Sequence, residues 1–180
     1  NGDHRNLHVR SRRQRKMCIR DSIKSLIKKV DNLIIVGAMA NNFFVYKNLK
    51  VGKSLIENDT KKIIKDIYEK AGDNKCEILI PEDCIVSKDF DGVGTPKNLR
   101  GIEDNDIILD IGPNTISKIE NKINQSNTIL WNGPAGYFEN ENFINGTMSI
   151  AKKISENTKN KSLISILGGG DTISAINKSK

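Results

Sequence analysis

An apolar run that ends in three consecutive glycines is the feature that most constrains how this chain can fold. Residues 163–167 are apolar apart from one serine, and Gly168–Gly170 follow directly, before Asp171 and Thr172. This order is typical of a strand, a tight turn and a helix start, because glycine permits unusual backbone angles and Asp or Thr caps helices. The unpaired N–H groups of such a helix start suit a bound anion. An ordinary strand-to-helix turn has the same pattern, so both interpretations stay open here.

The same order of strand, glycine and helix recurs along the chain. Apolar runs of strand length occupy residues 33–36, 107–111 and 128–131, and each precedes a glycine and a stretch with helical spacing. Two shorter strands are expected at 76–80 and 84–86, followed by a long irregular loop that starts at Phe90 and ends at Gly101. Apolar strands that alternate with helices predict an α/β fold with a mainly parallel sheet, covered on both faces.

The glycine breaks all fall at the C-terminal ends of expected strands. Gly37, Gly112, Gly133 and Gly168–Gly170 are therefore expected along one edge of a single parallel sheet. In open α/β sheets, ligands bind at this edge. The sequence thus predicts a ligand site built from several strand ends.

Other common kinds of site find little support in the sequence. Val51–Ser54 reads VGKS, but a phosphate-binding P-loop also requires glycine at the position of Lys47. Both histidines, His4 and His8, lie near the start, so the rest of the chain has no imidazole for a catalytic triad or a metal. The three cysteines form no CxxC pair, which argues against a disulfide framework.

The net charge of +7 suggests nucleic-acid binding until its position is considered. Residues 1–22 hold seven basic residues against two acidic ones, whereas the remaining 158 residues hold 22 against 20. A basic tail on a near-neutral domain is a weaker signal of nucleic-acid binding than a basic face on a folded domain.

Residues 1–21 show no apolar periodicity, so we expect a disordered or foreign leader, with a nucleic-acid-binding arm as the third alternative. A folded domain is expected over residues 22–180, which contain no apolar run of about 18 residues that could span a membrane.

Several motifs, in this order and at these distances, resemble the C-terminal, nucleotide-binding domain of the phosphoglycerate kinase family. They are LDIGP at Leu109–Pro113, WNGPAGYFE at Trp131–Glu139 and LGGGDT at Leu167–Thr172, joined by Val36–Ala40 and by VGKSL at Val51–Leu55. The resemblance covers about residues 23–178. It implies a Rossmann-like, three-layer α/β domain that is incomplete at both ends, in a fragment that lacks the N-terminal domain of the enzyme.

The resemblance also implies a ligand and the residues that hold it. The ligand is MgATP or MgADP, in an enzyme that transfers a phosphoryl group between ATP and 3-phosphoglycerate in glycolysis. The positions implied at the phosphates are Gly169, Gly170, Asp171 and Thr172, with Asp171 also near the Mg²⁺ ion. A ribose-binding carboxylate is implied at Glu139, a contact beside the phosphate chain at Asn132, and the walls of an adenine slot at Gly37, Ala38, Leu109 and Pro134. The resemblance assigns no catalytic residue to this chain.

The chain departs from the family pattern at several places. A lysine-bearing glycine motif is expected just before the helix at Ile23, but Ile19 stands where a phosphate-facing lysine would be. Val36-Gly37-Ala38 stands where three glycines are more common, and Ile107-Ile108 stands where Met-Gly is more common, which together predict a narrower adenine slot. We expect a cytoplasmic monomer that meets 3-phosphoglycerate only through the missing domain and binds neither nucleic acid nor membranes. A non-catalytic nucleotide-binding α/β module is the alternative function.

Overall fold

A computed structural model describes residues 23–160 and 163–177 of the chain. The leader expected at residues 1–21 lies outside this part. The chain divides into two compact units, of which unit 1 comprises the described residues up to Leu33 together with Asn58–Leu79. Unit 2 comprises Ile34–Glu57 and the described residues from Ile80 onwards. Every residue implied at the nucleotide site belongs to unit 2.

Unit 1 combines a two-stranded sheet with an amphipathic helix. Its elements are α3 (Lys61–Asp73), β2 (Glu77–Leu79) and all but the last residue of β1 (Asn32–Ile34), with a further helical turn at residues 23–26. On α3, Ile64, Ile67 and Ala71 repeat at helical spacing and are buried. Lys24 pairs with Asp66 at 3.0 Å. The helix expected from this periodicity is therefore present.

Unit 2 contains the other helices and strands, and from β5 onwards they alternate as the sequence predicts. They are α2 (Ala38–Tyr46), β3 (Asp83–Ser87), β4 (Thr95–Asn98), β5 (Ile107–Ile111), α4 (Pro113–Gln125), β6 (Thr128–Asn132), α5 (Asn145–Asn160), β7 (Ile164–Gly168) and α6 (Gly170–Asn177). Two short 3₁₀ turns occupy Leu99–Gly101 and Glu141–Phe143. The α/β class is confirmed.

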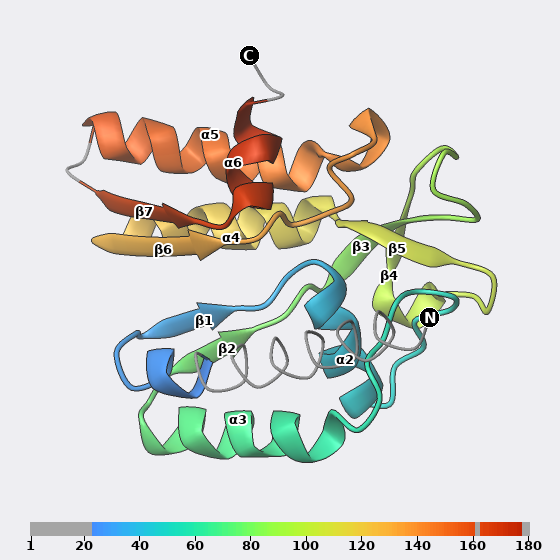
Figure 1. The fold of residues 1–180 in the computed structure, drawn as a ribbon, viewed down its shortest axis with the longest axis horizontal. Coiled ribbons are helices and arrows are strands. Elements are labelled where there is room, and N and C mark those ends of the chain that lie inside the picture. Colours follow the sequence, from blue (N-terminus) through green and yellow to red (C-terminus); the bar gives the residue numbers. More distant parts are fainter. Residues whose placement is uncertain (1–22, 161–162, 178–180) are drawn as a thin grey trace, which may run out of the picture. The chain divides into compact units, whose positions relative to one another are not determined.

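Strands β6 and β7 form a parallel pair that carries the site. Figure 1 shows them side by side, and their register places Asn132 opposite Gly168. Gly133 and Gly169 therefore follow the two strands at the same edge, as predicted. One face of the pair packs on α4 and α5 through a core formed by Trp131, Ile116, Ile119, Ile123, Ile150 and Ile154. The other face carries Leu130, Ile164 and Ile166, each more than half exposed.

Strands β3, β4 and β5 pair differently from the expectation of a single parallel sheet. Among the described residues, they form a separate antiparallel sheet in the order β4-β3-β5. Antiparallel pairing sets the end of β5 beside the start of β3, so the Cα of Gly112 faces the Asp83 carboxyl. A Cβ on Gly112 would lie only 2.5 Å from Asp83 Oδ2. Gly112 therefore accommodates Asp83 at the start of α4. Its predicted place on one edge of a single parallel sheet is wrong, and so is that of Gly37, because β1 pairs with β2 in another sheet.

The sequence does not predict strand β4, because its residues lie in the stretch with the composition of an irregular loop. It contains Pro96, which pairs in register with Ile85. Proline lacks an N–H donor and is confined in sheets mainly to edge strands, where β4 lies. The described helices include none that is both long and apolar enough to cross a membrane.

Candidate functional site

The glycine-rich turn between β7 and α6 has the open backbone that an anion site requires. Gly169 has φ +85°, in the left-handed region that favours glycine. Helix α6 begins at Gly170, where a Cβ would meet no atom within 4 Å. Asp171 lies exposed in the first helical turn, rather than capping the helix from outside it. At this helix start, the backbone of Gly169 and Gly170 and the carboxylate of Asp171 are therefore exposed to solvent.

Asn132 lies directly over this turn. A Cβ placed on Gly169 would lie 2.5 Å from Asn132 Oδ1, well inside van der Waals contact. A side chain at position 169 would therefore displace the Asn132 amide. The structure thus brings together two residues that the resemblance implies at the phosphate chain.

Thr172 joins the turn to the segment that follows β6. Its side chain is fully buried, and Oγ1 accepts a hydrogen bond from the backbone N–H of Gly133 at 2.7 Å. This contact holds the two strand ends in a fixed relation. A phosphate contact through Thr172 stays a prediction, and the structure adds a structural role for its hydroxyl.

Two of the residues implied around the adenine, Gly37 and Pro134, lie against each other in the same unit. A Cβ on Gly37 would lie 3.1 Å from the carbonyl oxygen of Pro134, so the start of α2 lies against the 133–139 segment. Ala38, the first residue of α2, is exposed. Leu109 is buried in β5, and its carbonyl oxygen accepts the N–H of Tyr137 at 2.6 Å.

The segment Gly133–Glu139 is anchored by its backbone along most of its length. Trp131 Nε1 donates to the Gly133 carbonyl oxygen at 2.7 Å, and the N–H of Ala135 donates to Oγ1 of the buried Thr147 at 2.9 Å. Phe138 is buried, whereas the neighbouring Glu139 is exposed. The segment therefore holds the Glu139 carboxylate at the surface from a fixed base.

An aromatic contact beside this segment was missed by sequence reasoning. The rings of Phe90 and Tyr137 meet edge to face, with centroids 5.2 Å apart. The Asn140 and Asn142 side-chain amides donate to the carbonyl oxygens of Phe90 and Gly92 at 2.9 and 3.1 Å. These contacts join residues about 50 positions apart, so no local spacing could have indicated them.

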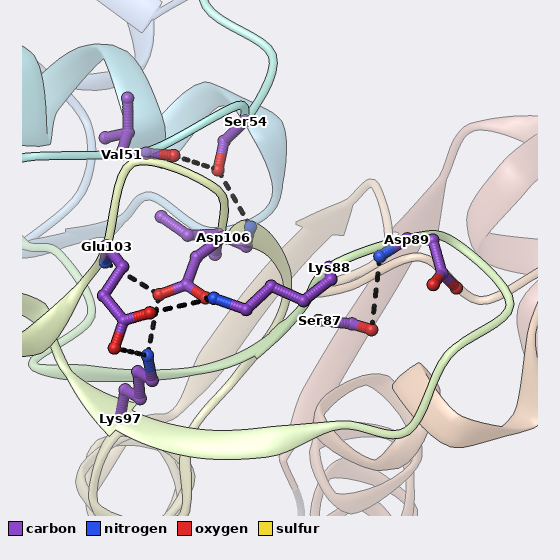
Figure 2. A network of polar contacts seen from close by, with 9 residues as sticks. Val51, Ser54, Ser87, Lys88, Asp89, Lys97, Glu103 and Asp106 are labelled. Carbon is purple, nitrogen blue, oxygen red and sulfur yellow. Dashed lines mark hydrogen bonds and ion pairs between the residues drawn. The ribbon is translucent and has the colours of Figure 1, made fainter.

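A charged network lies around Asp106, outside the candidate nucleotide site. Figure 2 shows Lys88 and Lys97 pointing toward Asp106, at 2.8 and 2.9 Å from its carboxylate oxygens. Both lysines also pair with Glu103, and the Asp106 side chain is 1% exposed. These four residues and Asp89 line a surface depression, in which three acids face two lysines, so the depression does not favour an anion.

The same network explains the VGKS sequence. Ser54 is buried, donates to the Val51 carbonyl oxygen and accepts the N–H of Ile108 at 2.8 Å, as Figure 2 shows in part. The N–H of Lys53 donates to the Asp106 carbonyl oxygen at 2.7 Å. The backbone of this turn and the Ser54 hydroxyl thus bind it to the start of β5. These groups have structural partners, which agrees with the conclusion from the sequence that the turn is not a P-loop.

Replacing Asp106 with asparagine should reduce the acid sensitivity of folding. Burial alone raises the pKa of Asp106, but hydrogen bonds from Lys88, the Glu103 N–H and Lys97 outweigh it and hold the pKa well below its usual value. A lowered pKa stabilises the fold above the unfolded-state value of 3.8, and this stabilisation is lost as the pH falls below it. Asp106→Asn should therefore take up about one proton fewer on unfolding between pH 4 and pH 2.

Urea unfolding at several pH values measures this difference in proton uptake. Asp104→Asn is the matched control, because Asp104 is an exposed acid whose partner is Lys50. The control should keep the acid slope of the unaltered chain. An equal slope for Asp106→Asn would contradict the stabilising role assigned to the network.

The side chains at the glycine-rich turn can be compared with the ligands that the implied Mg²⁺ ion requires. In the described ranges, no three His, Cys, Asp or Glu side chains are grouped as a metal site. Mg²⁺ bound with a nucleotide commonly takes one or two carboxylates and completes its shell with phosphates and water. The exposed oxygens of Asp171, beside an open helix start, fit such a role.

Comparison with known sequences places this arrangement in a family. The sequence model described as phosphoglycerate kinase matches residues 19–180. A phosphoglycerate kinase of Wolbachia pipientis from Culex pipiens is 45% identical over 163 residues, which are 88% of this chain and 41% of that relative. One from Xanthobacter autotrophicus is 39% identical over 85% of this chain and 39% of its own length. The chain thus spans about two fifths of the length of these relatives.

Solved structures agree with the sequence match. Phosphoglycerate kinase from Coxiella burnetii aligns with a TM-score of 0.81 and 36% identity, over 87% of this chain and 40% of that one. The enzyme from Pyrococcus horikoshii aligns with a TM-score of 0.66 and 26% identity, over 89% and 41%. These similarities confirm the Rossmann-like α/β class. The chain therefore belongs to the phosphoglycerate kinase family.

Proposed function

We propose that this chain is the nucleotide-binding part of a phosphoglycerate kinase and that it holds MgADP or MgATP at the shared end of β6 and β7. One observation carries the proposal: segments far apart in sequence meet there. Asn132 lies over Gly169, and Thr172 binds the N–H of Gly133. These contacts support a single site built from two strand ends.

The phosphate end of the nucleotide is assigned to the start of α6. Gly169 and Gly170 let the phosphates approach the backbone, and the helix N-terminus favours negative charge. Asp171 would hold Mg²⁺, which neutralises phosphate charge when bound. Asn132 would orient the phosphate chain from the β6 side. Phosphoryl transfer asks a protein mainly for such positioning and charge stabilisation.

The nucleoside end is assigned to the segment Gly133–Glu139 and the start of α2. Pro134 and Gly37 lie against each other, beside the exposed Ala38. With Leu109 beneath the segment, they would form the adenine slot. The exposed Glu139 carboxylate would accept hydrogen bonds from the ribose hydroxyls.

The reaction is proposed from the family alone. The whole enzyme would transfer a phosphoryl group between MgATP and 3-phosphoglycerate in glycolysis, and the acceptor would bind to a domain outside this chain. We further propose that the protein is a cytoplasmic monomer that uses no nucleic-acid or membrane partner. A non-catalytic nucleotide-binding module would share the binding site without the transfer.

Substitution of Asp171 tests the metal role. Asp171→Asn should weaken ADP binding in Mg²⁺ by about 1–3 kcal/mol, because a charged ligand is replaced by a neutral amide. Binding measured in EDTA should change little. Isothermal titration calorimetry with and without Mg²⁺ measures both values, with Asp104→Asn as a control for loss of an exposed acid distant in sequence. Equal affinity of the unaltered chain with and without Mg²⁺ would remove Asp171 from this role.

Substitution of Glu139 tests the ribose role. Glu139→Ala should cost ADP binding about 1–3 kcal/mol, whether or not Mg²⁺ is present. The matched ligand is 2′,3′-dideoxy-ADP, which lacks the hydroxyls that the carboxylate would bind. Calorimetry should show that Glu139→Ala barely changes the affinity for this analogue. An equal loss for both ligands would mean that Glu139 does not act through the ribose.

A further inference from the structure

Asp110 is a buried carboxyl that no step of nucleotide binding uses. It lies in β5 and is 3% exposed. Oδ2 accepts the N–H of Gly146 and Oδ1 accepts the N–H of Ile111, both at 2.8 Å. Asp110 therefore contacts the first turn of α5, where Gly146 lies, and the preceding residue, Leu109, accepts the N–H of Tyr137.

Two glycines make room for this carboxyl. A Cβ on Gly136 would lie 2.6 Å from Asp110 Cγ, and a Cβ on Gly146 would lie 3.1 Å from the same atom. Asp110 is therefore in close contact with both the 133–139 segment and the first turn of α5. A side chain at Gly136 would clash with the Asp110 carboxyl and also with the backbone oxygen of Phe143, 2.6 Å from a Cβ there.

We propose that Asp110 is a positioning residue for the segment Gly133–Glu139. Its carboxyl sets the spacing between Gly136 and Gly146, and thereby holds Pro134 and Glu139 where a nucleotide can reach them. The effect on binding rests on the proposed function, whereas the effect on the segment itself does not. Asp110 is too deeply buried to touch the ligand.

The protonation state of Asp110 should alter this contact near neutral pH. Burial raises the pKa of Asp110 to about 7, although the N–H groups of Gly146 and Ile111 act to lower it. Burial is therefore the cause of the rise, and the other buried acid of this sheet, Asp83, is bound separately at the start of α4. The carboxylate accepts one N–H on each oxygen, but protonation turns one oxygen into a donor. Since the pKa is raised above 3.8, this group stabilises the fold most at low pH and loses that contribution as the pH rises through 7.

Two measurements on the ¹⁵N-labelled full chain test the proposal. Amide spectra from pH 5.5 to 8.5 should show a transition near pH 7 at Gly146 and Ile111 that Asp110→Asn abolishes. Calorimetry with MgADP at pH 7.5 should show roughly tenfold weaker binding for Asp110→Asn, the scale of one lost hydrogen bond to a charged group. Asp83→Asn is the matched control, since Asp83 is also buried and accepts two backbone N–H groups, at Asn114 and Thr115. Asp83→Asn should keep the amide transition near pH 7, and its affinity for MgADP should stay within about twofold of that of the unaltered chain.

The outcomes separate this proposal from the proposed function. If the unaltered chain binds no ADP, the proposed function fails. The NMR amide signals of residues 133–139 then decide the positioning role. Changes in their chemical shifts in Asp110→Asn support the role, and unchanged chemical shifts overturn it. If Asp110→Asn does not fold, Gly136→Ala takes its place, with Gly101→Ala as control because a Cβ there meets nothing within 4 Å. Gly136→Ala should weaken MgADP at least tenfold and Gly101→Ala should not. Equal affinity for Asp110→Asn and the unaltered chain would overturn the proposal.

Discussion

Purified by itself, the 180-residue chain should release ADP from MgATP and 3-phosphoglycerate no faster than a blank. The proposed reaction requires two bound substrates in line, and holding them so can contribute about 7–11 kcal/mol of the barrier. The chain spans about 41% of its Wolbachia relative, and the site proposed at the ends of β6 and β7 would account for the nucleotide alone. Closure that excludes water from the transferring group also needs a second lobe. The expected difference from a whole enzyme is therefore many orders of magnitude in rate.

A coupled assay that follows ADP release measures this, with the full-length Wolbachia enzyme as the positive control. The chain should still bind MgADP under the assay conditions. If it released ADP in a manner that depends on 3-phosphoglycerate and is abolished by Asp171→Asn, the chain would itself contain an acceptor site, and the proposed division of roles would be wrong.

Gly52→Ala should lower the free energy of unfolding by about 2–5 kcal/mol, because it combines left-handed strain with overpacking. Gly52 has φ +57°, and a Cβ there would lie 2.6 Å from the Glu103 carbonyl oxygen and closer still to that of Asp106. Both obstacles are backbone atoms, and moving them would break the bond from Lys53 N–H to Asp106.

Gly72→Ala is the matched control for this substitution. Gly72 lies in α3, and a Cβ there meets nothing within 4 Å, so alanine should be neutral or stabilise by up to about 1 kcal/mol. Urea unfolding of the two variants measures the contrast. Equal stabilities would mean that the Val51–Ser54 turn is not fastened to β5 as described.

The elements that could be predicted from sequence are those fixed by local pattern. β5, β6, β7 and the α3 and α4 helices follow directly from apolar runs and helical spacing, and their glycine ends indicated the β6–β7 edge. The antiparallel sheet could not be predicted in this way. Strand β4 carries a proline and little apolar character, and the pairing of β3 with β5 depends on contacts that no local pattern records.

The candidate site likewise has some residues that local sequence patterns indicate and others that only the tertiary fold brings together. The glycines and Asp171 stand out because helix starts and tight turns have local signatures. The contact of Asn132 with Gly169 and that of Pro134 with Gly37 come from the tertiary fold. Asp110 lies within the LDIGP motif, but only the structure shows that its carboxyl lies between Gly136 and Gly146, which are distant from it in sequence.

The most direct test of the central claim is an NMR titration of the ¹⁵N-labelled chain with MgADP. Saturable shift changes should be largest for the amides at the two strand ends and the start of α2, namely Gly37, Ala38, Gly133, Glu139, Gly169, Gly170, Asp171 and Thr172. The amides around the Asp106 network should shift little. If no amide shows a saturable shift, or if the largest shifts gather at Lys88, Lys97 and Glu103 instead, the shared end of β6 and β7 is not the nucleotide site.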